Sequence, residues 1–389
     1  MRRTLLALAL MLTVARPAAA QQTLKDVLSF LLTNRSIPTG DFAGDSQAAA
    51  AARDAITELL LSELTSFPIN SPASGFTYRL DPALGTDVRS SRHFGPFFVE
   101  RSLTGGKGQL SFGVAHTSSS FDTIDERSLR DGTLVATASR LITETQPFDT
   151  ETLTLPIERR TVSVSGLVGV TDRLDVSAAV PFVTVRFNGQ RVDTYRGTSV
   201  VQAIATARVS GLGDVRLRAK YNVWRVGASG LALAAEARLP TGNPDNLFGS
   251  GETVVTPRII GSAERDRIAV HGNLGYALGG ASKTLEYAGA LTVAGASRLT
   301  LVLECIGRRV DAGGRLAYVT ALNPSLVGVE TIRLSGTEET TNRSAIVTGF
   351  RWNIAERLLL NVNVVRPLTS AGLNARWTPT VTLDYSLGN

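Results

Sequence analysis

Three cationic side chains, Arg216, Arg218 and Lys220, occur at every second position of one short stretch, and the positions between them are apolar. Successive side chains of a β-strand point to opposite faces, so this spacing predicts a strand with one charged and one apolar face. Two kinds of chemistry suit such a charged face. The cations can pair with acids on neighbouring strands and rigidify an interior, or their excess can draw anionic or polarisable solutes into a pore.

Further ionisable residues occupy the same phase of other alternating segments. We expect the following side chains to face one polar interior and to be its candidate pore lining: Arg216, Arg218, Lys220, Glu236, Arg238, His271, Glu286, Glu304, Arg308, Arg351, Arg376 and Asp384. An interior with so many charges needs water or ion pairing, because an isolated buried charge is costly.

A histidine and a serine lie two positions apart in His116-Thr117-Ser118 and share one predicted strand face. A nucleophile and its base could meet there, as a lipid hydrolase would require. The motif is short, and no third group is evident that would orient the histidine. We therefore expect a polar rim at the level of lipid headgroups and predict that the protein is not an enzyme.

The potential metal ligands are scattered. His93, His116, His271 and the single Cys305 are far apart and show no metal-ligand spacing. The glycine-rich run 105–108 precedes a strand instead of joining a strand to a helix, so it does not predict a phosphate-binding loop. We expect no metal, no cofactor and no internal disulfide.

The alternating pattern recurs in about twelve segments, each with the roughly 9–11 residues that a tilted membrane strand needs. They begin near Gln109, Thr161, Leu174, Asp214, Leu231, Thr253, Arg267, Thr284, Arg298, Ser344, Arg357 and Ala375. This repetition predicts an all-β fold, a transmembrane antiparallel β-barrel, because strands in lipid must satisfy all their backbone groups. A soluble, secreted β-sandwich is the alternative, since its strands also alternate.

The connections between these segments are alternately tight and long. The tight ones are residues 171–173, 226–230, 264–266, 296–297 and 355–356, and the long ones are 122–149, 188–211, 240–252, 279–283, 311–342 and 368–374. Outer-membrane barrels have this layout, with tight periplasmic turns, longer external loops and both termini in the periplasm. We expect the loops Asp122–Asp149 and Asp311–Asn342 to fold over or into the mouth of the barrel.

The N-terminal part has a different character. Residues 1–20 combine Arg2 and Arg3, an apolar core and a run of alanines, which predicts a cleaved secretory signal and a mature chain that begins near Gln21. Residues 21–92 contain two amphipathic helices, Thr23–Thr33 and Asp45–Thr65, followed by a linker. These helices could plug the barrel, rest in the periplasm or pack against another chain. Residues 93–389 form the predicted barrel domain.

The bulk charge adds one exclusion. The formal net charge is +6, and it falls to about +3 when the three arginines of the signal are removed. A balance this small does not predict a nucleic-acid partner.

A turn-rich loop after one strand, Leu239-Pro240-Thr241-Gly242-Asn243-Pro244-Asp245-Asn246-Leu247-Phe248-Gly249-Ser250-Gly251, carries a family resemblance. It resembles outer-membrane proteins assigned to the meta-cleavage pathway of phenol degradation, which look related to transporters of hydrophobic compounds. Residues 171–176 and 180–181 add to the similarity, which covers roughly residues 94–389. The resemblance implies an outer-membrane channel or transporter for small, perhaps aromatic, substrates. One departure is the chain end, where Tyr385 is followed by Ser-Leu-Gly-Asn instead of closing the sequence.

Together these patterns predict a porin-like barrel in the outer membrane of a Gram-negative cell, exported through a cleaved signal peptide. Its expected partners are outer-membrane lipid, a small-molecule solute and the barrel assembly machinery. A structural or surface-interaction barrel without transport is the competing hypothesis, and an outer-membrane lipid hydrolase is a remote one. A barrel of about twelve strands is wide enough for a pore or for a filled lumen.

Overall fold

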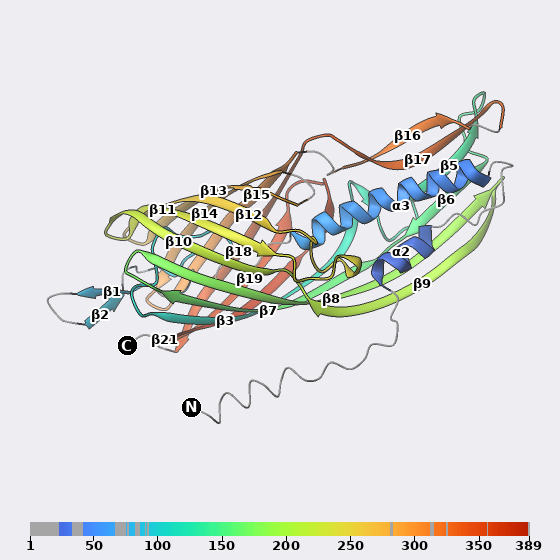
Figure 1. Cartoon of the computed structure of the whole chain (residues 1–389). Coiled ribbons are helices and arrows are strands. Elements are labelled where there is room, and N and C mark those ends of the chain that lie inside the picture. The colour runs from blue at the N-terminus through green and yellow to red at the C-terminus, as the bar shows by residue number, and fades with distance from the viewer. Residues whose placement is uncertain are drawn as a thin grey trace.

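The computed structural model describes residues 23–32, 42–66, 75, 78–81, 86–89, 91, 93–280, 283–311, 315–323, 326–355 and 357–387. The predicted signal at residues 1–20 lies outside this part of the chain. A short hairpin of β1 (Tyr78–Asp81) and β2 (Thr86–Arg89) stands at the end of the molecule where the C-terminus also lies (Figure 1).

Twelve antiparallel strands close into a barrel, which confirms the predicted fold class (Figure 1). They are β3 (Leu110–Ile124), β7 (Ile157–Gly169), β8 (Leu174–Tyr195), β10 (Val215–Val226), β11 (Ser229–Leu239), β12 (Val254–Arg265), β13 (Ile268–Ala277), β14 (Thr284–Ala296), β15 (Leu299–Val310), β18 (Thr341–Ala355), β19 (Leu358–Pro367) and β21 (Thr378–Leu387). The ring closes where β21 pairs with β3, with Val381 opposite His116.

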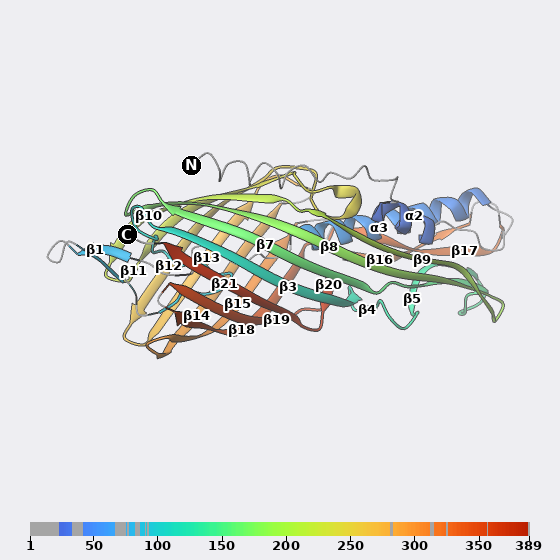
Figure 2. The ribbon, with the colours of Figure 1, turned by 90° about the horizontal axis from the view of Figure 1, so that it is seen from below.

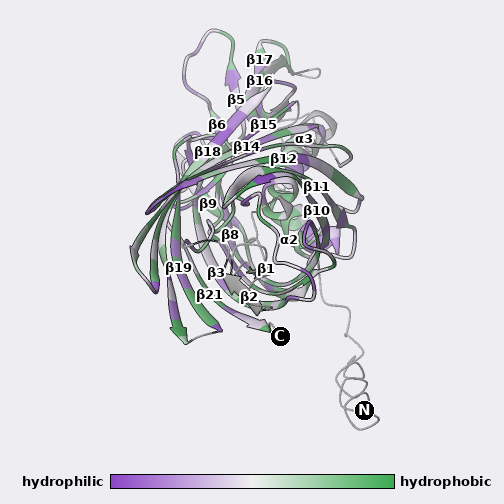
Figure 3. Cartoon of the chain, turned by 90° about the vertical axis from the view of Figure 1, so that its left-hand side faces the viewer, coloured by the Kyte–Doolittle hydropathy of each residue, from purple (hydrophilic) through white to green (hydrophobic). Residues whose placement is uncertain are grey.

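The two faces of the barrel wall differ as the alternation predicts. Apolar side chains point outward, and Val270 and Leu383 remain 49% and 46% exposed. Polar side chains point inward, and Asn361 and Thr382 are buried. An apolar belt of this extent around a closed ring is the surface that lipid requires. The barrel therefore spans a membrane, and Figure 3 looks along it from the tight-turn end.

None of the described helices is both long enough and apolar enough to cross a membrane.

Several of the long connections contain strands, which corrects one expectation. They contain β4 (Arg127–Ser128), β5 (Leu134–Leu141), β6 (Asp149–Thr154), β9 (Thr198–Leu212), β16 (Arg315–Leu322), β17 (Val329–Thr337) and β20 (Leu373–Ala375). These strands carry the barrel wall away from the mouth instead of folding over or into it (Figures 1 and 2). Ladder pairing in the order β16, β17, β5, β6, β8 and β9 joins them into one extension, here called the outer sheet.

The length of β8 explains why the wall continues. It has 22 residues, about twice what a tilted membrane strand needs. Its first part pairs with β10, and its second part pairs with β9. In that second part the inward side chains Val183, Val185 and Phe187 are apolar and buried. The inner face of the outer sheet therefore needs an apolar cover.

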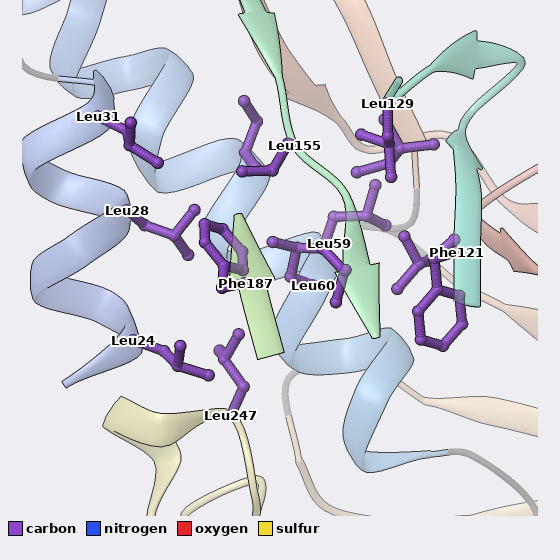
Figure 4. Packing of buried hydrophobic residues seen from close by; sticks show 14 of the residues in the cluster. Leu24, Leu28, Leu31, Leu59, Leu60, Phe121, Leu129, Leu155, Phe187 and Leu247 are labelled. Carbon is purple, nitrogen blue, oxygen red and sulfur yellow. The ribbon is translucent and has the colours of Figure 1, made fainter. Parts of the chain in front are cut away.

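Two helices supply this cover. Helix α2 (Leu24–Leu32) and helix α3 (Phe42–Thr65) agree closely with the predicted helices and pack on the outer sheet. Figure 4 shows their buried leucines against Phe187 of β8 and Leu155. A Cβ atom on Gly189 of β8 would overlap Leu31, so glycine at this position permits the close approach of α2. The helices thus lie at the long-connection end of the barrel.

The turn-rich loop after β11 is an ordered anchor for α2. The carboxylate of Asp214, at the junction of β9 and β10, accepts hydrogen bonds from the backbone N–H groups of Gly242 (3.1 Å) and Ser250 (2.9 Å). The loop contains the 3-10 helix η2 (Pro244–Asn246), and Asn246 Oδ1 accepts a hydrogen bond of 3.1 Å from the N–H of Leu24. The loop residues recognised in the sequence therefore connect the barrel rim to the first helix.

Candidate functional site: the lumen and its two closures

The tight-turn half of the lumen is filled by residues 93–105, here called the inner segment. Phe94 and Phe97 of this segment are buried. Phe97 packs in a cluster with Val302, Val347 and Val365 from the barrel wall. The inner segment is thus a folded part of the interior.

Glu304 on β15 holds the middle of the inner segment. Its carboxylate accepts hydrogen bonds from three successive backbone N–H groups, those of Phe97, Phe98 (3.0 Å) and Val99 (3.3 Å). Its side chain is 1% exposed. A carboxylate with three amide donors is well satisfied without water. Arg351 on β18 completes the clamp, donating to the carbonyl of Pro96 (2.6 Å) and lying 5.0 Å from the ring centre of Phe97.

Lys220 on β10 holds the end of the inner segment. Its ammonium group donates to the carbonyls of Arg101 (3.2 Å) and Leu103 (2.7 Å). Asp175 on β8 lies 3.7 Å from the Lys220 nitrogen and accepts a hydrogen bond of 2.9 Å from the N–H of Gly105. Inward-facing side chains of opposite charge, Lys220 and Asp175, therefore bind the same stretch of backbone.

Glu100 of the inner segment is buried beside three cations of the wall. It pairs with Arg218, and its carboxylate lies 3.7 Å from Arg258 and 3.9 Å from Lys220. A buried carboxylate requires such compensation, because the loss of its hydration is otherwise unfavourable. The charges predicted to line a pore thus partly serve to bind this segment.

Above the inner segment the barrel lumen contains a cavity of about 240 Å³. One wall is charged and consists of Arg216, Arg218, Glu236, Arg258, Glu286, Arg308 and Arg343. The other wall is largely apolar and includes Phe98, Ile306, Val365, Pro367, Leu373 and Ala375. Because Phe98 belongs to the inner segment, this segment is the floor of the cavity. A solute with both a polar and an apolar part matches the two walls.

The C-terminal end of α3 forms the other boundary of the cavity. Glu63 pairs with Arg343 and lies 2.7 Å from Arg308, and Ser66 also contacts Arg308. Arg238 donates a hydrogen bond of 3.0 Å to the carbonyl of Thr65. Cations near the last carbonyl groups of a helix interact favourably with its dipole. The end of α3 is therefore held by arginines of the barrel rim.

The predicted lining residues have different positions in the lumen. Arg216, Arg218, Glu236, Glu286 and Arg308 line the cavity, Lys220, Glu304 and Arg351 bind the inner segment, and Arg238 contacts the end of α3. His271 and Asp384 face inward at the tight-turn half, where they contact Ser262 (2.9 Å) and Asn361 (2.8 Å).

Arg376 differs from the expectation, because it is exposed and stands outside the cavity lining. It lies between β20 and β21, after a register shift that breaks the alternation on which the prediction depended.

Four important residues were missed. Arg258 is inward on β12, but Pro257 obscured its phase in the sequence. Arg343 fell next to a predicted loop, although it belongs to β18. Glu63 is on a helix and Glu100 lies in the irregular inner segment, so neither has strand periodicity. The excess of inward arginines was the available signal that acids would come from elsewhere.

The histidine and serine motif lies on the outer face of the barrel. His116 on β3 is exposed and stands between Val162 and Val381 on the neighbouring strands. Apolar neighbours on a lipid-facing surface do not form an enclosed reaction site.

A family comparison supports the resemblance over part of the barrel. Residues 145–297 match the family described as "Putative MetA-pathway of phenol degradation". The predicted family resemblance is confirmed. With its apolar belt and its alternation of tight and long connections, the barrel has the layout of an outer-membrane β-barrel. A comparison with curated proteins gives no match.

Solved structures with similarity to this barrel include three proteins. The COG4313 outer membrane channel from Pseudomonas putida F1 is 12% identical, with a TM-score of 0.46 over 74% of this chain and 98% of that chain. The Ralstonia pickettii toluene transporter TbuX is 11% identical, with a TM-score of 0.31 over 73% of this chain and 90% of that chain. A Pseudomonas aeruginosa FadL homologue is 9% identical, with a TM-score of 0.31 over 82% of this chain and 98% of that chain.

Proposed function

We propose that the protein is an outer-membrane channel or transporter for small molecules, including hydrophobic or aromatic ones. The observation that carries this proposal is the lumenal cavity with one charged and one apolar wall. A barrel that served only as a scaffold would gain stability from filling this volume with side chains. The family match to a phenol-degradation description supports the same substrate range.

Passage requires a change at the floor of the cavity. The inner segment occupies the tight-turn half, and Phe98 separates this half from the cavity. We infer that a solute enters from the long-connection end and leaves when the inner segment shifts within the lumen. Such a shift would open the lumen without a change in the barrel wall.

Liposome swelling tests this function. We expect a small sugar such as arabinose to enter liposomes that contain the full protein or a variant lacking residues 21–92, with faster entry for the variant. A tetrasaccharide is the size control and should not enter. Swelling with neither protein form would contradict transport and favour the structural barrel, for which the densely filled inner half is the supporting observation.

We also propose that residues 1–20 direct export and are then removed. N-terminal sequencing of the protein from an outer-membrane fraction should give a start near Gln21. A start at Met1 in that fraction would contradict this proposal.

A further inference from the structure

One carboxylate at the cavity boundary comes from a helix. Glu63 of α3 lies between Arg308 of β15 and Arg343 of β18, and both arginines line the cavity. Glu63 is 9% exposed and Arg343 is 6% exposed. Two guanidinium groups from neighbouring strands thus converge on one acid that does not belong to the barrel wall.

The charges of the cavity lining are unequal. Five arginines and three glutamates line it, and Glu63 is one of these three acids. The other two, Glu236 and Glu286, already pair with Arg218 and with Arg258 (2.5 Å) on the barrel wall. If the Glu63 side chain withdrew, five arginines would face these two acids and Glu100 of the inner segment, an excess of positive charge that favours the entry of an anion.

The apolar wall lies directly beside the two arginines. Arg343 stands so close to Gly372 that an added Cβ there would meet its guanidinium group at 2.8 Å. The next residue, Leu373, lines the cavity and is buried. A cavity of about 150 Å³ can hold benzene, and the volume here is about 240 Å³. One ring with an attached carboxylate fits this combination of volume, charge and apolar surface.

We propose that the Glu63 carboxylate occupies the position taken by the acid group of an amphipathic organic anion, so that helix and solute compete for Arg308 and Arg343. This inference rests on the proposed transport function and names its substrate class. The Glu63 carboxylate is then an internal competitor that leaves the two arginines when a suitable anion arrives. Leu59, Leu60 and Leu64 are buried in the apolar cluster under the outer sheet, so the helix stays packed and only the Glu63 side chain must move.

The test measures binding of benzoate to the full protein in detergent at neutral pH by isothermal titration calorimetry. Glu63→Gln removes the competing charge and keeps the shape of the side chain. Glu58→Gln is the matched control, because Glu58 is an exposed acid of the same helix. Benzamide is the neutral probe of nearly the same size as benzoate.

Benzoate should bind at least about tenfold more tightly to Glu63→Gln than to the wild type or to Glu58→Gln. Benzamide should bind equally to all three proteins. In Arg308→Gln, benzoate binding should fall below that of the wild type, and unchanged gel mobility of the unheated barrel would show that the variant is folded. Equal benzoate affinity in Glu63→Gln and Glu58→Gln, or an equal gain for benzamide, would overturn the proposal.

Ion conductance across planar bilayers separates the two proposals. Conduction without a change in benzoate binding would reject the competition and leave the channel function intact. Absence of both conduction and solute flux in every form would instead reject the channel function.

Discussion

The two boundaries of the cavity are built from different bonds. At the floor, wall side chains bind backbone groups of the inner segment. Glu304 accepts hydrogen bonds from three successive N–H groups, and Lys220 donates hydrogen bonds to two carbonyl groups. At the other boundary, the wall holds the end of α3 through the side chain of Glu63 and through one hydrogen bond to the backbone, from Arg238 to the carbonyl of Thr65. The floor is therefore fixed by many bonds, and the upper boundary by few.

This difference teaches which closure can be exchanged for a solute. A bond to the backbone cannot be replaced without moving the chain, and leaving a buried N–H unsatisfied is costly. An ion pair between side chains can be replaced by any anion of similar geometry. The floor thus suits a lasting barrier, while the end of α3 suits a reversible one.

The largest expected effect follows from breaking the floor with Glu304→Ala. Three buried N–H groups lose their acceptor, and each such loss costs about 1–3 kcal/mol. We expect a decrease of about 3 kcal/mol or more in the free energy of unfolding, measured by urea denaturation in detergent, together with higher conductance. Glu158→Ala on the outside of β7 is the control and should stay within about 0.5 kcal/mol of the wild type. Equal stabilities of the two variants would show that Glu304 does not fix the floor.

A moderate effect should separate the two boundaries by salt. Raising the salt from about 0.15 M to about 1 M shortens the Debye length from about 8 Å to about 3 Å. We expect hydrogen exchange of the Glu63–Ser66 amides to accelerate several-fold. The reason is that salt weakens the ion pairs of the Glu63 side chain with Arg308 and Arg343 at the cavity edge. Exchange of the Phe97–Val99 amides should not change, since they are buried hydrogen-bond donors. Faster exchange of the Phe97–Val99 amides, with unchanged exchange of the Glu63–Ser66 amides, would contradict this difference between the two boundaries.

The smallest effect concerns α2, which lies beyond both closures. Hydrogen bonds from the Thr23 hydroxyl (2.7 Å) and backbone N–H (3.0 Å) hold the pKa of Asp26 below its ordinary value of 3.8. A lowered carboxyl pKa means that its contribution to stability is present above the ordinary value and is lost as the pH falls through the folded-state value. Protection factors of α2 amides should therefore drop slightly between about pH 6 and about pH 2. Asp26→Asn should abolish this change, and its persistence in that variant would exclude the Thr23 to Asp26 contact as the cause.

The barrel was predictable because lipid imposes a strict period of two. Outward Val270 and Leu274 alternate with inward His271 and Asn273, so the strand and its faces can be identified without a structure. The outer sheet was missed because Asn188-Gly189-Gln190 has the composition of a turn. In the structure, Gly189 lies within β8 and leaves space for Leu31. The contact with α2, which is distant in the sequence, therefore explains why position 189 is a glycine.

The inner segment could not be predicted, for a different physical reason. Its backbone is paired with side chains such as Glu304 and Lys220 instead of with a strand, so no periodicity marks it. The alternation of charged and apolar residues predicted which side chains of the wall point inward. It does not specify which group each inward charge binds. Glu63 and Glu100 come from outside the strands, and only the folded chain brings them to the arginines.

The seam between β3 and β21 also has a consequence for biogenesis. The ring is sealed by the strand made late in synthesis, and it surrounds an inner segment made before any wall strand. Pulling that segment through a finished ring would carry the unpaired charge of Glu100 into a confined, poorly hydrated space before it meets its arginine partners. We therefore expect the inner segment to be in place before β3 and β21 pair. The barrel wall then assembles around this segment.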